Sequence, residues 1–434
     1  MAYFLKYGDG TVEVPLSDDQ IAYVVNPNPK ECRDASAETL IDLALDFPIG
    51  TGKLEDTVKP GEKVCIVISD GTRSWQKPAV ILKKLLVRLN SAGIQDKDVY
   101  IISGRGTHRA QSDEDLAALV SPEIYSRVAF VHDHDPLDEK KLTYVGTTSR
   151  GTRVLLNSDA VKADRVILVG SVLHHFLAGF SGGRKSVLPG IAAYETVQQN
   201  HALSLAASSD SGGGFLRSVR SGNLIDNPVQ LDMCEAAAML NPDFIVNTVV
   251  DEEYNIIKVF AGDLFKAHKE ACELVNKLNA VEIPKKVPVV IASAGGYPKD
   301  INVYQPLKTL CHMTECVSDG GTIIMLSESR EGFGSADAES QMKDYDNMAD
   351  REKALKTRYS IGGATGFLYA EAAEKYNFIY VTKLPKEEFS KTKMKIASSL
   401  VEALSMIPSP GPGEVCLMPN GSVTLPVLKA DIGL

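Results

Sequence analysis

Hydrophobic residues along the chain form short continuous runs that alternate with amphipathic segments. Lys63–Ser69 and Arg165–Gly170 are apolar runs of the kind found in strands buried on both faces of a sheet. Between them, a stripe of apolar residues at spacings of three and four predicts a helix over 79–89, formed by Ile81, Leu82, Leu85, Leu86 and Leu89. Alternating strands and helices are typical of a parallel sheet covered by helices, so the expected fold class is α/β.

The same patterns predict the remaining elements. Gly8-Asp9-Gly10 indicates an opening hairpin, and Ser112-Asp-Glu-Asp115 resembles a capping box at the start of a helix. Further strands are expected at 99–102, 127–131, 287–293, 322–326 and 378–381, with two more within 243–261. Helices are expected at 192–202, 264–278, 303–317, 337–360, 363–376 and 386–406.

The length of 434 residues exceeds what one core usually holds. Proline and charge interrupt the pattern at Val281-Glu-Ile-Pro-Lys285. We therefore expect an N-terminal α/β domain over 1–280, a C-terminal α/β domain over 281–410, and a tail over 411–434 that packs on either. Both sheets should be mainly parallel, with an interdomain active-site cleft.

Charge and composition narrow the function. The 46 basic and 56 acidic residues give a net charge of −10, which argues against binding nucleic acid through its phosphates. No run approaches the roughly 20 apolar residues that span a membrane, and the N-terminus lacks the features of a secretory signal, so we expect a cytoplasmic protein. The seven cysteines are scattered without a C-x-x-C pair, which argues against a disulfide framework.

Polar residues gather where predicted strands end, the place where α/β sheets bind ligands. Four segments do so: Ser69–Arg73, Gly104–Arg109, Gly170–Ser186 and Gly295–Lys308. Within the third, Gly179-Phe-Ser-Gly-Gly-Arg-Lys-Ser186 nearly satisfies the P-loop pattern, but Arg184 replaces the glycine that precedes the lysine. That replacement argues against a nucleoside triphosphatase.

The ordered set of His108, His174-His175, the loop that ends in Lys185, and His201 resembles the lactate racemase family, whose enzymes use a nickel-pincer nucleotide. The turn Asp70-Gly-Thr-Arg73 and the segment Tyr304–Lys308 match in the same order, so the resemblance covers about residues 63 to 310. It implies an isomerase, a racemase or epimerase that inverts C2 of a 2-hydroxy acid.

The resemblance also implies the cofactor, nickel in pyridinium-3,5-bisthiocarboxylic acid mononucleotide. It would be covalently bound through Lys185, with His201 as the metal ligand and with Thr72, Gly182 and Gly183 binding the cofactor. Separate maturation proteins would install it. The alternatives are an exposed loop lysine, a core or helix-capping histidine, and glycines that serve only the turn.

In the implied reaction, the pyridinium carbon accepts the α-hydrogen as hydride while a histidine takes the hydroxyl proton. Two opposed bases are needed, and His108 and His175 match the family pair. His175 is preferred to His174 because it lies ten residues before Lys185. In an extended segment adjacent side chains point to opposite faces, so His174 is expected to be structural.

For the substrate carboxylate, the resemblance points to Arg73 with Asp70, and to Lys308 with Gln305 and Tyr304. Asp70 and Thr72 could instead cap a helix, and Tyr304 could belong to the core. The turn after Arg73 reads Ser74-Trp75 where the family pattern has proline. Lactate and a larger hydroxy acid are therefore both open.

Two other function classes remain to be weighed. One is a zinc hydrolase with His174, His175 and His201 as ligands, although H-E-x-x-H spacing is missing. The other is a non-catalytic carrier of nickel or nucleotide, for which His108 and His175 would be unnecessary. The sequence leaves the oligomeric state open.

Overall fold

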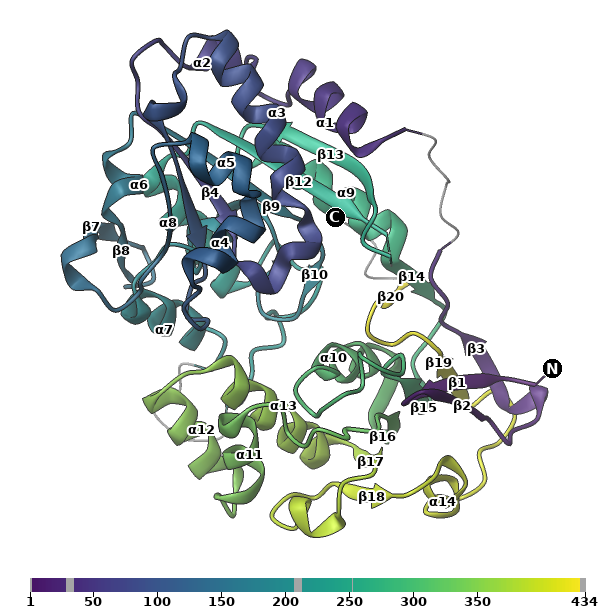
Figure 1. The fold of residues 1–434 in the computed structure, drawn as a ribbon. Helices are drawn as coiled ribbons and strands as arrows, with labels where there is room; N and C mark the ends of the chain where they lie inside the picture. The colour runs from purple at the N-terminus through teal and green to yellow at the C-terminus, as the bar shows by residue number, and fades with distance from the viewer. Residues whose placement is uncertain (1, 29–34, 207–212, 252, 430–434) are drawn as a thin grey trace. The chain divides into compact units, whose positions relative to one another are not determined.

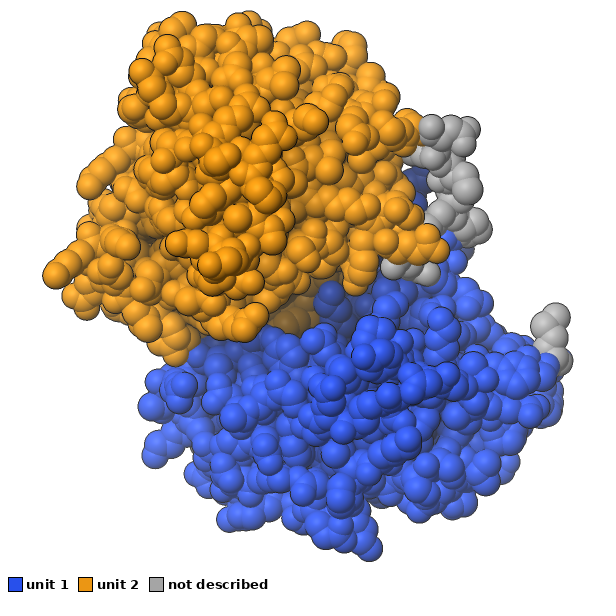
Figure 2. Space-filling view, viewed as in Figure 1, with its two compact units in different colours: residues 1–30, 204–221, 277–434 blue, residues 31–203, 222–276 orange. Residues whose placement is uncertain are grey.

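A computed structural model describes residues 2–28, 35–206, 213–251 and 253–429. The chain forms two compact units, each built from separate stretches of sequence (Figure 2). Unit 1 comprises residues 1–30, 204–221 and 277–434, and unit 2 comprises residues 31–203 and 222–276. Each unit contains one six-stranded sheet.

The sheet of unit 2 has the order β13-β12-β9-β4-β5-β6, and only the β12–β13 pair is antiparallel (Figure 1). Alternate residues of β4, Val64, Ile66 and Ile68, join a core that the first five helices of this unit also supply. The strands are β4 (Val64–Ser69), β5 (Val99–Gly104), β6 (Phe130–Asp133), β9 (Arg165–Ser171), β12 (Phe244–Val250) and β13 (Ile256–Gly262).

Helices and two hairpins complete unit 2. The helices are α1 (Ala37–Asp46), α2 (Leu54–Thr57), α3 (Pro78–Ser91), α4 (Asp113–Val120), α5 (Pro122–Arg127), α6 (Ser158–Lys162), α7 (Tyr194–Ala202), α8 (Pro228–Leu240) and α9 (Lys266–Asn279). The hairpins pair β7 (Leu142–Thr147) with β8 (Arg153–Asn157), and β10 (His174–His175) with β11 (Gly179–Phe180). Short 3-10 turns follow β4 (η2, Gly71–Gln76) and β11 (η5, Gly183–Ser186).

The sheet of unit 1 is parallel throughout, in the order β18-β17-β16-β15-β19-β3. Its strands are β3 (Ile21–Val24), β15 (Val287–Ser293), β16 (Val317–Leu326), β17 (Asn377–Val381), β18 (Lys395–Ala397) and β19 (Val415–Met418). Leu5 of the hairpin of β1 (Phe4–Tyr7) and β2 (Gly10–Glu13) packs in one core with β15, β17 and α14 (Leu400–Ser405).

The other helices of unit 1 are α10 (Leu307–Cys316), α11 (Ala336–Lys343), α12 (Met348–Thr357) and α13 (Ile361–Lys375). Helices α10 and α13 contact β15 and β17, respectively. A short parallel pair joins β14 (Ala280–Ile283) and β20 (Leu425–Leu428).

The predicted α/β class with mainly parallel sheets is confirmed, and the extended segment at His174-His175 is present as β10. Two helix predictions were wrong. Residues 386–406 contain β18 before the short α14, and 337–360 form two helices, because Asn347 caps a new one by accepting a hydrogen bond from the Asp350 amide. The strand expected at 127–131 begins at Phe130, since α5 runs to Arg127.

The division into units departs from the expected domains of 1–280 and 281–410. The N-terminal 30 residues belong to unit 1, because β3 pairs with β19 at the edge of its sheet. Residues 204–221 also belong to unit 1, where the Phe215 ring packs against that of Phe367 on α13 at a centroid distance of 6.0 Å. The described part of the tail also lies in unit 1, where β19 pairs with β15. Across the described ranges, no helix is long and apolar enough to cross a membrane. The cysteines there are free thiols, and Cys32 lies outside those ranges.

Candidate active site

Asp70 is the centre of a hydrogen-bonded group at the carboxyl end of β4. Its buried carboxylate accepts hydrogen bonds from the Thr72 hydroxyl (2.9 Å), from Arg73 Nη1 (3.2 Å) and from His108 Nδ1 (2.8 Å). Asp70 makes no side-chain cap to η2, so the helix-capping alternative is not supported. β4 and β5 are neighbours in the sheet, which is why the loops that follow them bring these side chains together.

The Asp70 carboxyl is ionised despite its burial. Burial alone would raise its pKa, but the hydrogen bond from His108, the charge of Arg73 and the Thr72 hydroxyl hold the pKa below its usual value. An ionised carboxylate only accepts hydrogen bonds. His108 therefore carries its proton on Nδ1, and Nε2 presents a lone pair, as in a histidine prepared to act as a base.

Arg105 holds the backbone on which His108 lies. Its guanidinium contacts Asp133 (3.0 Å) and donates to the carbonyl oxygens of His134 (2.5 Å) and His108 (2.5 Å). His134 itself is fully buried, and its Nε2 lies 3.0 Å from the carbonyl oxygen of Ala192. His134 thus has a structural setting.

The β10–β11 hairpin separates the two adjacent histidines. His174 is buried, with Nε2 at 2.8 Å from Asn276 Oδ1 and its ring 5.1 Å from that of Phe180. His175 is half-buried, and its Nε2 lies 3.1 Å from Lys185 Nζ. Lys185 therefore contacts His175, the histidine that the sequence spacing favours.

The backbone sets the protonation of the His175 ring. The amides of Leu177 and Ala178 both donate to His175 Nδ1, at 3.1 Å and 3.3 Å. An imidazole nitrogen that accepts hydrogen bonds carries no proton, so the proton of the neutral ring lies on Nε2. Nε2 then faces the Lys185 amine at 3.1 Å. A lysine amine bonds covalently to an electrophilic carbon once it has lost its proton.

Arg184, which breaks the P-loop pattern, is buried and holds the loop of Lys185 in place through hydrogen bonds. It donates to the Ala178 carbonyl (2.6 Å), to Gln230 Oε1 (2.5 Å), and lies 2.9 Å from His268 Nε2. Ala178 is also one of the two amides that contact His175. Arg184 therefore connects the lysine loop to the turn that holds the histidine.

Gly182 and Gly183 have positive φ angles of 75° and 52°. A Cβ on Gly182 would lie 2.6 Å from Asn247 Oδ1, and one on Gly183 would lie 2.7 Å from the His268 ring. The Gly183 amide donates to Asn247 (2.8 Å). These contacts support the alternative that the glycines serve the turn, and amide binding of a cofactor phosphate stays a prediction.

His201 lies on α7 and is 4% exposed. Burial lowers its pKa to about 3, and a positive charge on Lys185 acts in the same direction when that amine is protonated. Its Nδ1 is 3.1 Å from Asn200 Oδ1. A neutral imidazole whose other nitrogen is hydrogen-bonded is the usual form of a histidine metal ligand, so this residue fits the predicted role.

The remaining predicted residues lie in unit 1, in the segment that follows β15 and in the first turn of α10. Tyr304 is half-buried, with its amide donating to the Phe333 carbonyl (3.1 Å), and Gln305 is exposed. Lys308 is the second residue of α10. All three thus follow the carboxyl end of a central parallel strand.

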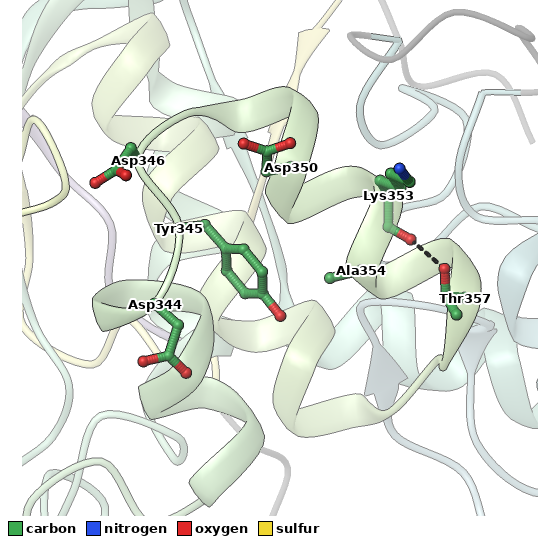
Figure 3. Close-up of a pocket in the computed structure, with 7 residues that line it drawn as sticks. All are labelled: Asp344, Tyr345, Asp346, Asp350, Lys353, Ala354 and Thr357. Carbon is green, nitrogen blue, oxygen red and sulfur yellow. Dashed lines mark hydrogen bonds between the residues drawn. The ribbon is translucent and has the colours of Figure 1, made fainter.

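Two other features bear on where a site could lie: the alternative zinc site and a hollow in unit 1. Within the described ranges, no group of three His, Cys, Asp or Glu side chains could hold a metal ion, so the predicted zinc site lacks its ligand cluster. A hollow of about 490 Å³ lies in unit 1 and is lined by Tyr345, Lys353 and three aspartates (Figure 3). None of the predicted site residues lines it.

Sequence reasoning missed the residues that support the predicted ones. In the sequence, Arg184 was noted only because it breaks the P-loop motif. An arginine in a glycine-rich loop, with no acidic residue nearby, is a signal for a buried side chain that holds the loop through hydrogen bonds. Asn200 contacts Asp232, which is 32 residues away. No local pattern connects that pair.

Comparisons with known proteins agree along most of the chain. The family model of the lactate racemase N-terminal domain matches residues 7–213, and that of the lactate racemase C-terminal domain matches residues 283–423. A lactate racemase of Lactiplantibacillus plantarum is 31% identical over 93% of this chain and 94% of its own. One from Thermoanaerobacterium thermosaccharolyticum is 33% identical over 76% of this chain and 75% of its own.

Solved structures show the same relationship. The lactate racemase apoprotein of Thermoanaerobacterium thermosaccharolyticum superposes with a TM-score of 0.86 and 28% identity, covering 98% of this chain and 100% of its own. A Thermotoga maritima protein with 19% identity and a TM-score of 0.61 covers 90% of this chain and 98% of its own, and shares the fold. With two domain models in order and a relative aligned over nearly its full length, the chain belongs to the lactate racemase family.

Proposed function

We propose that this protein is an isomerase that inverts C2 of a 2-hydroxy acid, either lactate or a larger analogue. The observation that carries the proposal is the contact between Lys185 Nζ and His175 Nε2 at 3.1 Å, which joins the predicted cofactor lysine to a predicted catalytic imidazole. The relatives named lactate racemase support the reaction class. The expected cytoplasmic location stays a prediction.

Lys185 and His201 are the residues that would hold the nickel-pincer nucleotide. Lys185 offers an amine 3.1 Å from His175 Nε2, and His201 offers a buried neutral imidazole. Nickel held by donors of the cofactor needs few protein ligands, which suits a site without a three-residue cluster in the described part of the chain. When bound, the cofactor supplies an electrophilic carbon that takes the α-hydrogen with its electron pair and returns it.

The protein's own residues handle the proton. His108 is oriented by Asp70 and presents Nε2 as an acceptor for the proton of the substrate hydroxyl. The positive charge that develops on the ring is stabilised by the buried carboxylate next to it. His175 would serve the opposite face of the planar 2-keto acid, where its Nε2 presents a proton to the carbonyl oxygen.

Arg73 would bind the substrate carboxylate. Its Nη1 is held by Asp70 and by the Thr72 hydroxyl (2.9 Å), which leaves the rest of the planar guanidinium to bind an anion. Lys308, with Gln305 and Tyr304, is proposed to bind the substrate as well. Trp75, two residues after Arg73, contacts Tyr254 within unit 2, with ring centroids 4.9 Å apart and ring planes tilted by 32°.

The test uses protein matured together with the family's cofactor-installing proteins. Enantiopure 2-hydroxy acids are incubated with wild type, Lys185→Ala and the exposed-lysine control Lys162→Ala, and the products are separated by chiral chromatography. Wild type and the control should racemise at least one acid and carry a mass adduct, while Lys185→Ala should do neither. An adduct that survives Lys185→Ala would refute the attachment site. A wild-type protein that carries the adduct yet inverts no acid would favour the carrier alternative.

A further inference from the structure

A chain of buried polar side chains lies behind His201 within unit 2. Thr148 follows β7, Asn200 precedes His201 on α7, and Asp232 lies on α8. Asn200 and Asp232 are completely buried, and Thr148 is 5% exposed. Burial of such groups is costly unless they are hydrogen-bonded, so their partners explain why they are there.

The partners of Asn200 determine which way its amide faces. Nδ2 donates to the Val229 carbonyl (3.0 Å) and to Asp232 Oδ2 (2.9 Å). A carbonyl accepts only, and so does a carboxylate. A flipped amide would set Oδ1 against two acceptors, so the orientation with Nδ2 toward Asp232 is fixed.

Asp232 is itself held from the other side. Its Oδ1 accepts a hydrogen bond from the Thr148 hydroxyl (2.5 Å), and that hydroxyl in turn accepts one from the Thr152 amide (3.1 Å). The hydroxyl is thus oriented as a donor to the carboxylate. Each member of the network has one available arrangement, which is the condition under which a buried polar network specifies a single geometry.

This arrangement selects one tautomer of His201. Since Nδ2 of Asn200 faces Asp232, its Oδ1 faces His201 Nδ1 at 3.1 Å. An amide oxygen accepts only, so Nδ1 must carry the ring proton, and the lone pair of the neutral ring is on Nε2.

We propose that Asn200, oriented by Asp232, is the positioning residue that holds His201 as the Nδ1–H tautomer with Nε2 directed as the metal ligand. The inference rests on the proposed function for the identity of the metal, whereas the tautomer is a property of the chain alone. Groups behind a metal-binding histidine commonly fix its tautomer and raise its ligand strength, and their loss typically weakens metal binding by roughly 10- to 100-fold.

The tautomer is measured first, on the wild-type apoprotein. Two-bond ¹H–¹⁵N correlation spectra of protein labelled with ¹⁵N-histidine distinguish the tautomers, and the His201 signal is assigned by its loss in His201→Gln. The expected pattern has a protonated Nδ1 and an unprotonated Nε2. A protonated Nε2, or an averaged mixture, would overturn the inference without needing any variant of the network to fold.

Metal retention is measured second, on matured protein. Asn200→Leu removes the acceptor from Nδ1 with little change in volume, so the Nδ1–H pattern should be lost and nickel should dissociate about 10- to 100-fold more readily. Asn157→Leu is the matched control, since Asn157 is also buried and also contacts a histidine, with Nδ2 at 3.3 Å from His134 Nδ1. It should leave both the His201 spectrum and the nickel content at wild-type values.

The results separate this inference from the proposed function. If Asn200→Leu keeps the Nδ1–H tautomer and full nickel, the positioning role is refuted even when wild type racemises a hydroxy acid. If wild type shows the expected tautomer but takes up no nickel during maturation, the inference about His201 as a metal ligand fails together with the proposed function.

Discussion

The two candidate catalytic histidines of unit 2 are held in different ways. His108 donates from Nδ1 to the buried carboxylate of Asp70, so its Nε2 presents a lone pair. His175 accepts at Nδ1 from the amides of Leu177 and Ala178, so its Nε2 presents a proton. Two rings of the same residue type thus face outward with opposite hydrogen-bonding character.

The His108 side and the His175 side of the proposed reaction are therefore not equivalent in this state. The ring beside the carboxylate is prepared to take a proton, and the ring beside the amides is prepared to donate a hydrogen bond. The first support is a side chain that substitution can remove. The second belongs to the backbone, so it can be altered only through residues that hold the turn, such as Arg184.

The largest expected effect comes from removing the base. His108→Gln should lower kcat for inversion by about 10³- to 10⁴-fold in both directions, since a well-placed general base contributes up to that factor. Nickel content and the mass adduct should stay at wild-type values. The measurement is the initial rate from each enantiomer, with nickel determined on the same sample. Nickel loss would make His108 a ligand and contradict its assigned role.

Removing the carboxylate that orients His108 should lower kcat by a smaller factor. In Asp70→Asn, the amide cannot fix the Nδ1–H form as a carboxylate does, and kcat should fall by roughly 10²- to 10³-fold. The matched control is Thr72→Val, which removes another hydrogen bond to the same carboxylate but leaves His108 in place. Equal losses in the two variants would show that Asp70 acts through the loop and not through the His108 tautomer.

Disturbing the other ring should have a smaller effect. Arg184→Met removes the donor to the Ala178 carbonyl and loosens the turn around His175, so kcat should fall by about 10-fold. Arg351→Met is the control, because Arg351 is a buried arginine of unit 1 that also donates to backbone carbonyls, those of Gln341 and Lys391. A comparable loss in the control would indicate general destabilisation.

The smallest effect concerns a histidine outside the reaction. Burial lowers the pKa of His134 to about 4, so between pH 7.5 and 5.5 the unfolded chain binds a proton there that the folded chain does not. Stability should therefore fall as the pH falls, by about 1.4 kcal/mol for this residue. Urea unfolding of wild type and His134→Gln at both pH values measures it, and the variant should show a shallower decline. An unchanged slope would contradict the buried neutral state.

Much of the fold could be predicted because its central strands are continuous apolar runs with helical stripes between them, as at 63–69 and 79–89. The segment 386–406 was mistaken for a helix because its short strand, β18, has three residues and carries no periodicity. The return of residues 204–221 to unit 1 could not be predicted, since local patterns do not specify which core a segment joins.

The candidate site, like the fold, could be predicted only in part. Asp70, Arg73 and His108 were expected together because they follow strands that neighbour each other in a parallel sheet. The opposite tautomers of His108 and His175 were not foreseeable, because one depends on a contact across 38 residues and the other on the local course of the backbone. Supporting residues such as Asp232 are recognised only once α7 and α8 are packed together.

In the proposed inversion, the α-hydrogen leaves C2 with its electron pair and returns to the same carbon. The most direct test incubates the matured enzyme with an enantiopure 2-hydroxy acid in deuterated water and follows both chirality and mass at C2. The proposed inversion predicts a racemic product that retains the original hydrogen at C2. Solvent deuterium at C2 in the inverted product would instead show ordinary proton abstraction and would contradict the proposed inversion.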